Sequence, residues 1–402
     1  MSWLKYLWIL CPMLVLGQYN TWTKLNNVGL GKRERATGFA IGSVGYLCGG
    51  VDTAELIHKD LWAYDPVADS WSQKANLPGS PRRDAVSFVI NNFAYVGTGM
   101  DSLSGPTGNT LKDFWRYNPQ TNSWSAIADF PGFGGQGIYF ATAFSVEGKG
   151  YLCGGKSGPE AYSNQLWEYK PSNNQWMQRA NFPGGVRYQL LSFAVGNKGY
   201  VGMGTDQNIF KKDMYCYDPG SNSWQAIAPF PAYERASATT FTLHDRGFVC
   251  LGNNGGLLKD LIEYNPATDL WTLRAEYGGS NRKGAISFVI DNKAYVGTGK
   301  GVSGKKSSWY VYEPSNYVAI EELASQIKIY PNPCVESIEI TAPSNEISKL
   351  KLYSSSGTVL YSSDYNHFTT HTIDLCKWNA GTYILWFETS DGQIIQKKIN
   401  KI

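Results

Sequence analysis

The sequence predicts an all-β fold built from six copies of one four-stranded unit. The first observation is an aromatic residue that follows Gly or Ala and precedes a glycine motif, about every fifty residues. These anchor residues are Tyr46, Tyr95, Tyr151, Tyr200, Phe248 and Tyr295. The second observation is an aromatic-x-Pro sequence later in each unit, beginning at Tyr64, Tyr117, Tyr169, Tyr217, Tyr264 and Tyr312. Matched positions at a single period indicate a repeat architecture.

Residues 82–124 show how one unit is built. Two apolar runs separated by Asn91-Asn92 predict a β-hairpin. Two further runs, FWRYNP and SWSAI, surround a turn rich in Pro, Asn and Thr. One such sheet is too small to bury its own aromatic side chains, but sheets stacked around an axis bury them between neighbours. The sequence therefore predicts a six-bladed β-propeller.

The glycine motifs, the Tyr-x-Pro sequences and a tryptophan seven residues after the tyrosine resemble the Kelch repeat over residues 18–314. The resemblance implies a Kelch-type propeller. Five units carry the tryptophan, at Trp71, Trp124, Trp176, Trp224 and Trp271. The sixth has Ala319 in its place, whereas Trp22 precedes the first unit. We therefore expect the N-terminal segment to supply the outer strand of the last blade and to close the ring.

Four regions follow from this organisation: residues 1–17, 18–320, 321–326 and 327–402. Residues 1–17 carry Lys5, an apolar run and Val15-x-Gly17, which predict a secretory signal peptide. Residues 18–320 form the propeller, and residues 321–326 are expected to be a linker. No other apolar run approaches the length of a membrane span, so we expect none in the mature chain. The net charge of +3 is too small to indicate nucleic acid as a partner, and we expect a monomer.

Residues 327–402 alternate apolar and polar positions between Ser-Gly and Asp-Gly turns, which predicts a small Ig-like β-sandwich. This tail resembles the C-terminal sorting domain of the type IX secretion system. The matching features are Tyr330-Pro331-Asn332-Pro333, the LYSSSG turn, the segment 379–383 and a lysine-bearing last strand. The resemblance implies that the type IX machinery is a partner. It also implies that the protein passes through the periplasm and is secreted or attached to the outer surface.

Six cysteines remain outside the predicted signal peptide. Cys48, Cys153, Cys216 and Cys250 lie on predicted strands in different blades, which favours buried free thiols. Cys334 and Cys376 both fall in the tail, where a disulfide between them is left open.

An arginine stands thirteen residues before five of the six anchors, and the third blade has Ile138 instead. These candidate ligand-binding residues are Arg33, Arg82, Arg187, Arg235 and Arg282. One interpretation is a ring of guanidinium groups at the channel mouth, suited to the carboxylates of an acidic peptide or sugar. The other is a set of internal ion pairs with Asp60, Asp113, Asp213 and Asp260. Blade three lacks both partners, whereas Arg282 faces Ser308, so Arg282 is the best candidate for a free arginine.

The segment that leads into the third blade, PGFGGQGIYF, carries three aromatic candidates for ligand binding, Phe133, Tyr139 and Phe140. On a glycine-rich loop at the channel mouth they would stack on sugar rings or anchor a partner. Alternatively, they fill a gap in the packing.

No cofactor and no metal is expected. The four histidines, His58, His244, His367 and His371, do not fall on channel-facing strands, and the copper ligands of Kelch-type radical oxidases have no counterpart here. The sequence favours a non-enzymatic module that binds a protein or glycan through the variable-loop face. The alternative is a small-sugar epimerase or mutarotase similar to the Kelch sialic-acid mutarotases. It would use arginine together with Glu34, Glu160 or Glu234.

Overall fold

A computed structural model describes residues 21–101, 109–207, 209–314, 320–342, 347–354, 357–365, 368–389 and 394–402. It divides into two units, Met1–Ser315 and Asn316–Ile402, each of which is described by itself. The predicted signal peptide at residues 1–17 lies outside the described residues. Among the described residues, no helix is long and apolar enough to cross a membrane.

Six four-stranded antiparallel sheets form the blades of the first unit. Blade one contains β2 (Thr37–Ile41), β3 (Val44–Cys48), β4 (Leu61–Asp65) and β5 (Ser70–Lys74). Blade two contains β6 (Val86–Ile90), β7 (Phe93–Gly97), β8 (Phe114–Asn118) and β9 (Ser123–Ala126). Blade three contains β10 (Thr142–Val146), β11 (Lys149–Cys153), β12 (Leu166–Lys170) and β13 (Gln175–Arg179).

The other three blades follow the same order. Blade four contains β14 (Leu191–Val195), β15 (Lys198–Gly202), β18 (Met214–Asp218) and β19 (Ser223–Ala226). Blade five contains β20 (Thr239–Leu243), β21 (Arg246–Cys250), β22 (Leu261–Asn265) and β23 (Leu270–Arg274). Blade six contains β24 (Ile286–Ile290), β25 (Lys293–Gly297), β28 (Trp309–Glu313) and β1 (Thr21–Lys24). Two small hairpins, β16 (Thr205–Asp206) with β17 (Ile209–Phe210) and β26 (Lys300–Gly301) with β27 (Gly304–Lys305), extend blades four and six.

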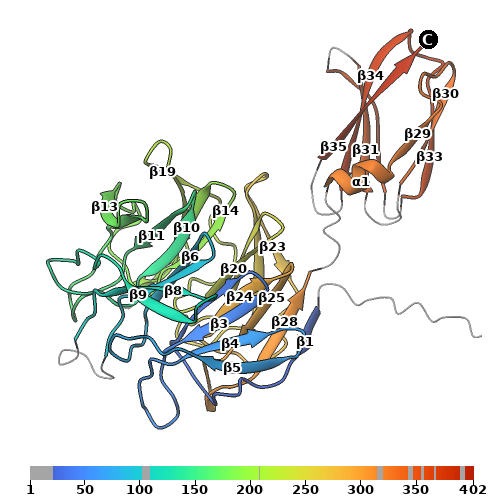
Figure 1. Cartoon of the computed structure of the whole chain (residues 1–402). Coiled ribbons are helices and arrows are strands. Elements are labelled where there is room, and N and C mark those ends of the chain that lie inside the picture. Colours follow the sequence, from blue (N-terminus) through green and yellow to red (C-terminus); the bar gives the residue numbers. More distant parts are fainter. Residues whose placement is uncertain are drawn as a thin grey trace, which may run out of the picture. The chain divides into compact units, whose positions relative to one another are not determined.

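The ring closes through strands from the two ends of the propeller. In Figure 1, β1, drawn in blue, lies beside β28, drawn in orange, and Trp22 is paired with Tyr312. The six inner strands contact one another in a complete circle, from β2 through β6, β10, β14, β20 and β24 back to β2. The predicted six-bladed all-β propeller is therefore confirmed.

At the four anchors that follow a glycine, this glycine meets the repeating phenylalanine of the neighbouring blade. A Cβ atom added to Gly45 in blade one would lie 2.1 Å from Cε2 of Phe288 in blade six. Such a distance is impossible for real atoms, so the ring of one blade packs directly on the backbone of the next. Glycine at this position thus leaves the space that the ring occupies.

The outer strands are also joined from blade to blade. In five blades the tryptophan Nε1 donates a hydrogen bond to an alanine carbonyl in the preceding blade. The donors are Trp22, Trp124, Trp176, Trp224 and Trp271. Trp22 donates to Ala275 at 3.0 Å, and its ring centroid lies 5.0 Å from that of Tyr312. The terminal strand is therefore held by the same contacts as the other outer strands.

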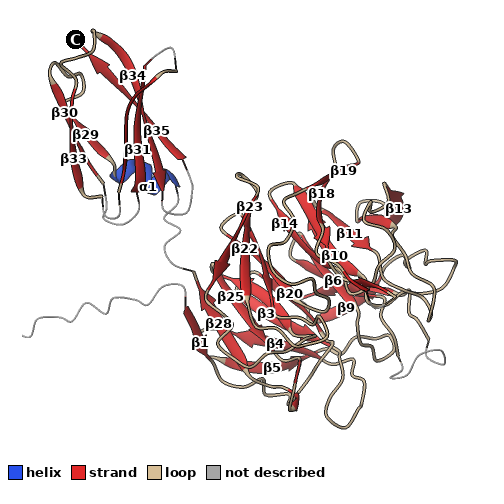
Figure 2. Ribbon diagram, turned by 180° about the vertical axis from the view of Figure 1, so that it is seen from behind, coloured by secondary structure: helices blue, strands red, loops and turns tan. Residues whose placement is uncertain are grey.

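The second unit is a β-sandwich, as predicted. One sheet contains β29 (Lys328–Tyr330), β30 (Ser337–Thr341) and β33 (Thr370–Asp374). The other contains β32 (Val359–Asp364), β31 (Ile347–Ser354), β34 (Gly381–Thr389) and β35 (Ile394–Lys401). Ile338, Leu350 and Leu385 are buried in the core that the sheets share. The expected linker at residues 321–326 is instead part of helix α1 (Ile320–Gln326), shown in blue in Figure 2, because Leu323 is buried in this core.

The cysteines among the described residues form no disulfide. Cys334 and Cys376, for which the sequence left a disulfide open, are both free thiols. Cys334 is buried with its Sγ 3.5 Å from the Asn400 carbonyl, whereas Cys376 is exposed and lies against the Glu336 carbonyl. In the propeller, Cys48, Cys153, Cys216 and Cys250 are buried free thiols, as predicted. Burial raises the pKa of Cys48 to about 12 and also raises the pKa of Cys153 and Cys250.

We expect Trp22→Ala to lower the free energy of unfolding of the propeller by about 3 kcal/mol, because it removes a packed ring and an interblade hydrogen bond. Chemical unfolding monitored by near-UV circular dichroism measures the change. Thr23→Ala, at an exposed position of the same strand, is the control and should change stability by less than about 0.5 kcal/mol. Equal effects of the two substitutions would contradict the role of Trp22 in closure.

Candidate functional site at the channel mouth

The segment leading into each blade lies beside the loop that connects the second and third strands of that blade. Glu34 pairs with Val51, and Val51 pairs with Ile57, through isolated β-bridges. Corresponding bridges join Tyr139, Lys156 and Tyr162 in blade three. The variable loops and the leading segments therefore share one face, and this face surrounds the mouth of the central channel.

Four of the five repeating arginines are buried in ion pairs inside the blades and do not line the mouth. The pairs are Arg33–Asp60 at 2.8 Å and Arg82–Asp113, Arg187–Asp213 and Arg235–Asp260 at 2.6 Å. Each guanidinium also donates to a backbone carbonyl at the end of the second strand, at Gly49, Thr98, Met203 or Leu251. The functional interpretation of these four arginines is therefore wrong, and the alternative of internal ion pairs holds.

The arginines lower the pKa of two aspartates in these pairs. Burial by itself would raise the pKa of Asp60 and of Asp113, but the hydrogen bonds and charges of Arg33 and Arg82 outweigh it. The pKa of each carboxyl is therefore lowered, and both aspartates stay ionised beside their arginines.

Arg282 has no aspartate, yet it is also inaccessible to a ligand, with 1% of its surface exposed. Its Nη1 donates to the Thr298 carbonyl at 2.9 Å, and its Nη2 donates to the Ser308 hydroxyl at 2.9 Å. Its Nε donates to the Ser280 carbonyl at 3.0 Å. The expectation of a free arginine at this position is wrong because hydroxyl and carbonyl groups replace the missing carboxylate.

The mouth is formed by residues two positions after the repeating arginine. All six have a left-handed backbone, with φ between 52° and 61°. They are Arg35, Asp84, Phe140, Gln189, Ser237 and Gly284. The Asp84 amide donates to the Arg35 carbonyl at 3.0 Å, and equivalent hydrogen bonds join other neighbouring blades around the axis. The sequence reasoning missed this ring, although its signal was present: a variable residue stands before Ala at five of the six positions.

A cavity of about 170 Å³ occupies the mouth. Its polar lining includes Glu34, Arg35, Asp84, Gln189, Ser237 and Lys283, and the ring of Phe140 also contributes. Below it lies a throat of about 250 Å³, which shares Ala36, Ala85 and Ala141 with the mouth. The throat is lined by paired hydroxyl groups, such as Thr37 with Ser87 at 2.6 Å. The two cavities thus form one continuous channel.

Carboxylates hold Arg35, which lines the mouth, and two cations beside it, Arg83 and Lys305. Asp84 lies 3.5 Å from Nη1 of Arg35 and is also hydrogen-bonded to Arg83. Glu34 lies 3.9 Å from Nε of Arg35 and 3.7 Å from Nζ of Lys305. Burial raises the pKa of Asp84, and the charges of Arg35 and Arg83 offset this only in part.

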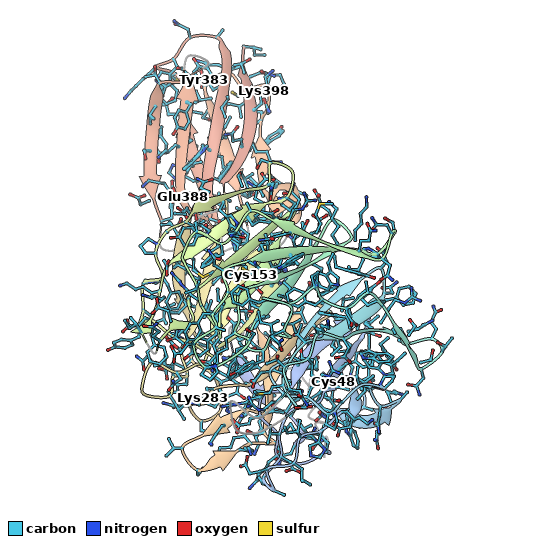
Figure 3. All side chains as sticks on the ribbon, turned by 90° about the vertical axis from the view of Figure 1, so that its left-hand side faces the viewer. Cys48, Cys153, Lys283, Tyr383, Glu388 and Lys398 are labelled. Carbon is cyan, nitrogen blue, oxygen red and sulfur yellow. The ribbon has the colours of Figure 1, made fainter. Side chains whose placement is uncertain are left out.

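Lys283, labelled in Figure 3, differs from these cations. Its ammonium group has no hydrogen bond or ion pair with any residue that the structure describes. Burial lowers the pKa of Lys283, and the charge of Arg35 lowers it further. The side chain of Arg35 lies close to this segment. A Cβ atom added to Gly284, the residue after Lys283, would lie 3.6 Å from the Cγ of Arg35. The Arg35 guanidinium in turn lies 5.3 Å from the centroid of the Phe140 ring.

The three aromatic candidates of blade three have different positions. Phe140 lines the mouth. Tyr139 is buried behind it, under the guanidinium of Arg83. Phe133 packs against the core between blades two and three, so its assignment to the site is wrong.

Comparisons with known proteins agree with this architecture. A family model described as "Secretion system C-terminal sorting domain" matches residues 328–401, and one described as "Kelch motif" matches residues 81–131. A solved structure titled "Structure of YjhT" superposes with a TM-score of 0.60 at 19% identity, covering 71% of this chain and 96% of that chain. At this level of identity the likeness shows the fold alone.

The chain is a Kelch-repeat propeller with a secretion sorting domain. The sorting domain indicates type IX secretion, with the Kelch propeller delivered to the cell surface or secreted. The tail also identifies the secretion machinery as a partner.

Curated relatives match parts of the Kelch propeller. Kelch-like protein 25 of Xenopus tropicalis is 28% identical over 160 residues, which cover 39% of this chain and 26% of the relative. The N-acetylneuraminate epimerase of Yersinia enterocolitica is 36% identical over 66 residues, which cover 16% of this chain and 17% of the relative. The corresponding protein of Yersinia pestis is 32% identical over 100 residues, which cover 24% and 23%. The chain thus spans about a quarter or less of the length of these curated relatives.

We expect Asp260→Asn to destabilise the Kelch propeller by about 3 kcal/mol, because it leaves the buried Arg235 without a counter-charge. Chemical unfolding monitored by tryptophan fluorescence measures the loss. Asp129→Asn, an exposed carboxylate on the same propeller, should have almost no effect. The converse substitution Ser308→Asp should stabilise the sixth blade by supplying the carboxylate that Arg282 lacks. A destabilising Ser308→Asp together with a neutral Asp260→Asn would contradict the bracing role.

Proposed function

We propose that this exported Kelch propeller binds a carboxylated sugar at the channel mouth. The observation that carries the proposal is the ammonium group of Lys283, which lines the mouth beside Arg35 without an ion pair among the described residues. Partial burial of an unpaired charge is unfavourable, and a ligand carboxylate would relieve this cost by binding there.

The other groups at the mouth suit a sugar. The side chain of Arg35 is 33% exposed, and its carboxylate contacts of 3.5 and 3.9 Å leave donors for a ligand. Gln189 and Ser237 offer neutral hydrogen bonds, and the Phe140 ring offers a surface for the apolar face of a pyranose. Carbohydrate recognition commonly combines such groups, because a sugar presents both hydroxyl groups and C–H surfaces.

The relatives support the same ligand class. Two proteins that match parts of this propeller are named N-acetylneuraminate epimerase, and N-acetylneuraminate is a carboxylated sugar. We therefore use it as the first probe, together with galacturonate as a smaller carboxylated sugar and glucose as a neutral one.

Isothermal titration calorimetry tests the proposal on the full chain. We expect the carboxylated probes to bind and glucose to bind at least about tenfold more weakly, because one charge-assisted hydrogen bond contributes roughly that factor. Lys283→Met should lower the affinity for both acidic probes by a similar factor. Lys112→Met, at an exposed lysine on the same face, is the matched control and should bind like the wild type. Equal affinity for glucose and galacturonate would contradict the proposal, as would binding of an acidic peptide alone.

The affinity should also depend on pH. An anion binds the charged ammonium form, so affinity is full below the pKa of Lys283 and falls as the pH rises through it. Because that pKa is lowered by burial and by Arg35, the fall should begin at a lower pH than for an exposed lysine. Lys283→Arg keeps its charge and should remove this fall in the alkaline range. Identical pH profiles for the wild type and Lys283→Arg would show that Lys283 does not bind the anion.

A second candidate function is sugar epimerisation or mutarotation, which requires proton transfer. The observation in its favour is Asp84, whose raised pKa makes a carboxyl group better suited to exchange a proton, in the same cavity as Lys283. Of the three glutamates considered from the sequence, Glu34 lines the mouth, whereas Glu160 and Glu234 are exposed and lie outside its lining. Exchange spectroscopy on the anomers of N-acetylneuraminate distinguishes the candidates. Faster exchange with the wild type than with Asp84→Asn supports an enzyme, and binding without exchange supports a binding module.

A further inference from the structure

We infer that the mouth continues into a second subsite around Lys156, so that the ligand is an acidic oligosaccharide of at least two sugar units. This inference rests on the proposed function and specifies the ligand class further. It comes from a cluster of aromatic rings on blades three and four that the internal packing of the propeller does not fully explain.

Lys156 is held over the faces of three tyrosine rings. Its Nζ lies 4.5 Å from the ring centroid of Tyr188, 5.4 Å from that of Tyr139 and 5.8 Å from that of Tyr162. The backbone places it there, because its amide donates to the Tyr139 carbonyl at 2.9 Å and an isolated bridge joins it to Tyr162. Cation–π contacts stabilise the ammonium group but use none of its hydrogen bonds.

The charge of Lys156 has no carboxylate partner within the described residues. Glu160 acts on it electrostatically, but no ion pair or hydrogen bond joins the two side chains. Three N–H donors of Lys156 are therefore oriented by the rings and still available to an anion. The equivalent residues of the other blades are Val51, Met100, Thr205, Asn253 and Lys300. A lysine over three tyrosines is thus a feature of blade three and not of the repeat.

The cluster is continuous with the mouth. The Phe140 ring, which lines the mouth, lies 5.0 Å from that of Tyr139 and 6.0 Å from that of Tyr188. Tyr188 and Tyr162 are stacked, with centroids 5.4 Å apart and an interplanar angle of 14°. Tyr162 is half-buried, so this row of rings leads from the channel to the accessible surface.

A ligand with one acidic sugar at the mouth would place the next unit along this row. Its carboxylate would accept hydrogen bonds from Lys156, and its ring would stack on Tyr162. Lys283 and Lys156, which have no ion pair among the described residues, would then each bind one carboxylate of the same oligosaccharide. A sugar acid with one carboxylate supplies only one such partner, whereas an oligosaccharide that carries a charge on successive units supplies one to each lysine.

The test compares a monomer with a dimer of one acidic sugar. Galacturonate and its α1,4-linked dimer are titrated into the full chain in a calorimeter. We expect the wild type to bind the dimer about tenfold more tightly than the monomer, because one further charge-assisted contact contributes roughly that factor. Lys156→Met, which keeps an unbranched apolar side chain over the rings, should abolish this preference without changing the affinity for the monomer.

Three further variants complete the design. Lys156→Arg keeps the charge and should retain the preference for the dimer. Lys212→Met, at an exposed lysine on the same face of blade four, should also retain it. Tyr162→Ala, which removes the outer ring, should weaken binding of the dimer alone. This variant gives an independent readout if Lys156→Met unfolds, which thermal denaturation would reveal.

The outcomes separate this inference from the proposed function. Absence of binding of both probes overturns the proposed function and the second subsite with it. Equal affinity of the wild type for monomer and dimer overturns the second subsite and leaves the mouth site in place. A dimer preference that is unchanged in both Lys156→Met and Tyr162→Ala also overturns the second subsite and leaves the mouth site in place.

Discussion

The buried arginines are the constraint on which the functional face depends. In four blades the guanidinium joins the segment leading into the blade to the end of the second strand, through a carbonyl, and to the beginning of the third, through an aspartate. The guanidinium charge can be buried because the partner aspartate is ionised and nearly all of the guanidinium hydrogen bonds are made. Two residues later the chain turns into the left-handed region and reaches the channel mouth. The arginine thus positions a variable residue at the mouth without itself contacting a ligand.

Blade three shows what the repeat permits when this constraint is absent. Ile138 replaces the arginine and is buried, while Gln165 accepts the hydrogen bond of Trp167 that an aspartate accepts in blades one and two. Apolar packing therefore supports this blade where an ion pair supports others. The same segment carries Phe140, the only aromatic residue that lines the mouth among the described residues, with Tyr139 buried behind it. Blade three therefore supplies an aromatic ring on one side of a mouth that is otherwise lined by charged, polar, small or aliphatic residues.

The sequence predicted the fold well because propeller blades repeat. Trp22 was matched to the last blade by counting one missing tryptophan, and the structure places it opposite Tyr312. The joint absence of arginine and aspartate in blade three likewise favoured the ion pairs that the structure contains. Helix α1 was not predicted, because a short segment outside any repeat has no period, and Leu323 is buried only through tertiary contacts.

The mouth could not be predicted in the same way. Its residues differ from blade to blade, so a search for matched positions passes over them. Which variable residue reaches the axis depends on a left-handed turn at Arg35 and its equivalents, and the Ala that follows five of these six residues is a weak signal for such a turn. The environment of Lys156 was also hidden, because Tyr139, Tyr162 and Tyr188 come from three separate segments.

Burial of the propeller thiols affects how they withstand oxidation during export through the periplasm. An oxidising periplasm joins accessible cysteines into disulfides, and the reactive species is the thiolate. Cys48, Cys153 and Cys250 lie in three separate blades, and burial raises the pKa of each so that the thiolate is scarce. Once the propeller has folded, burial in separate blades protects these cysteines from oxidation and mispairing.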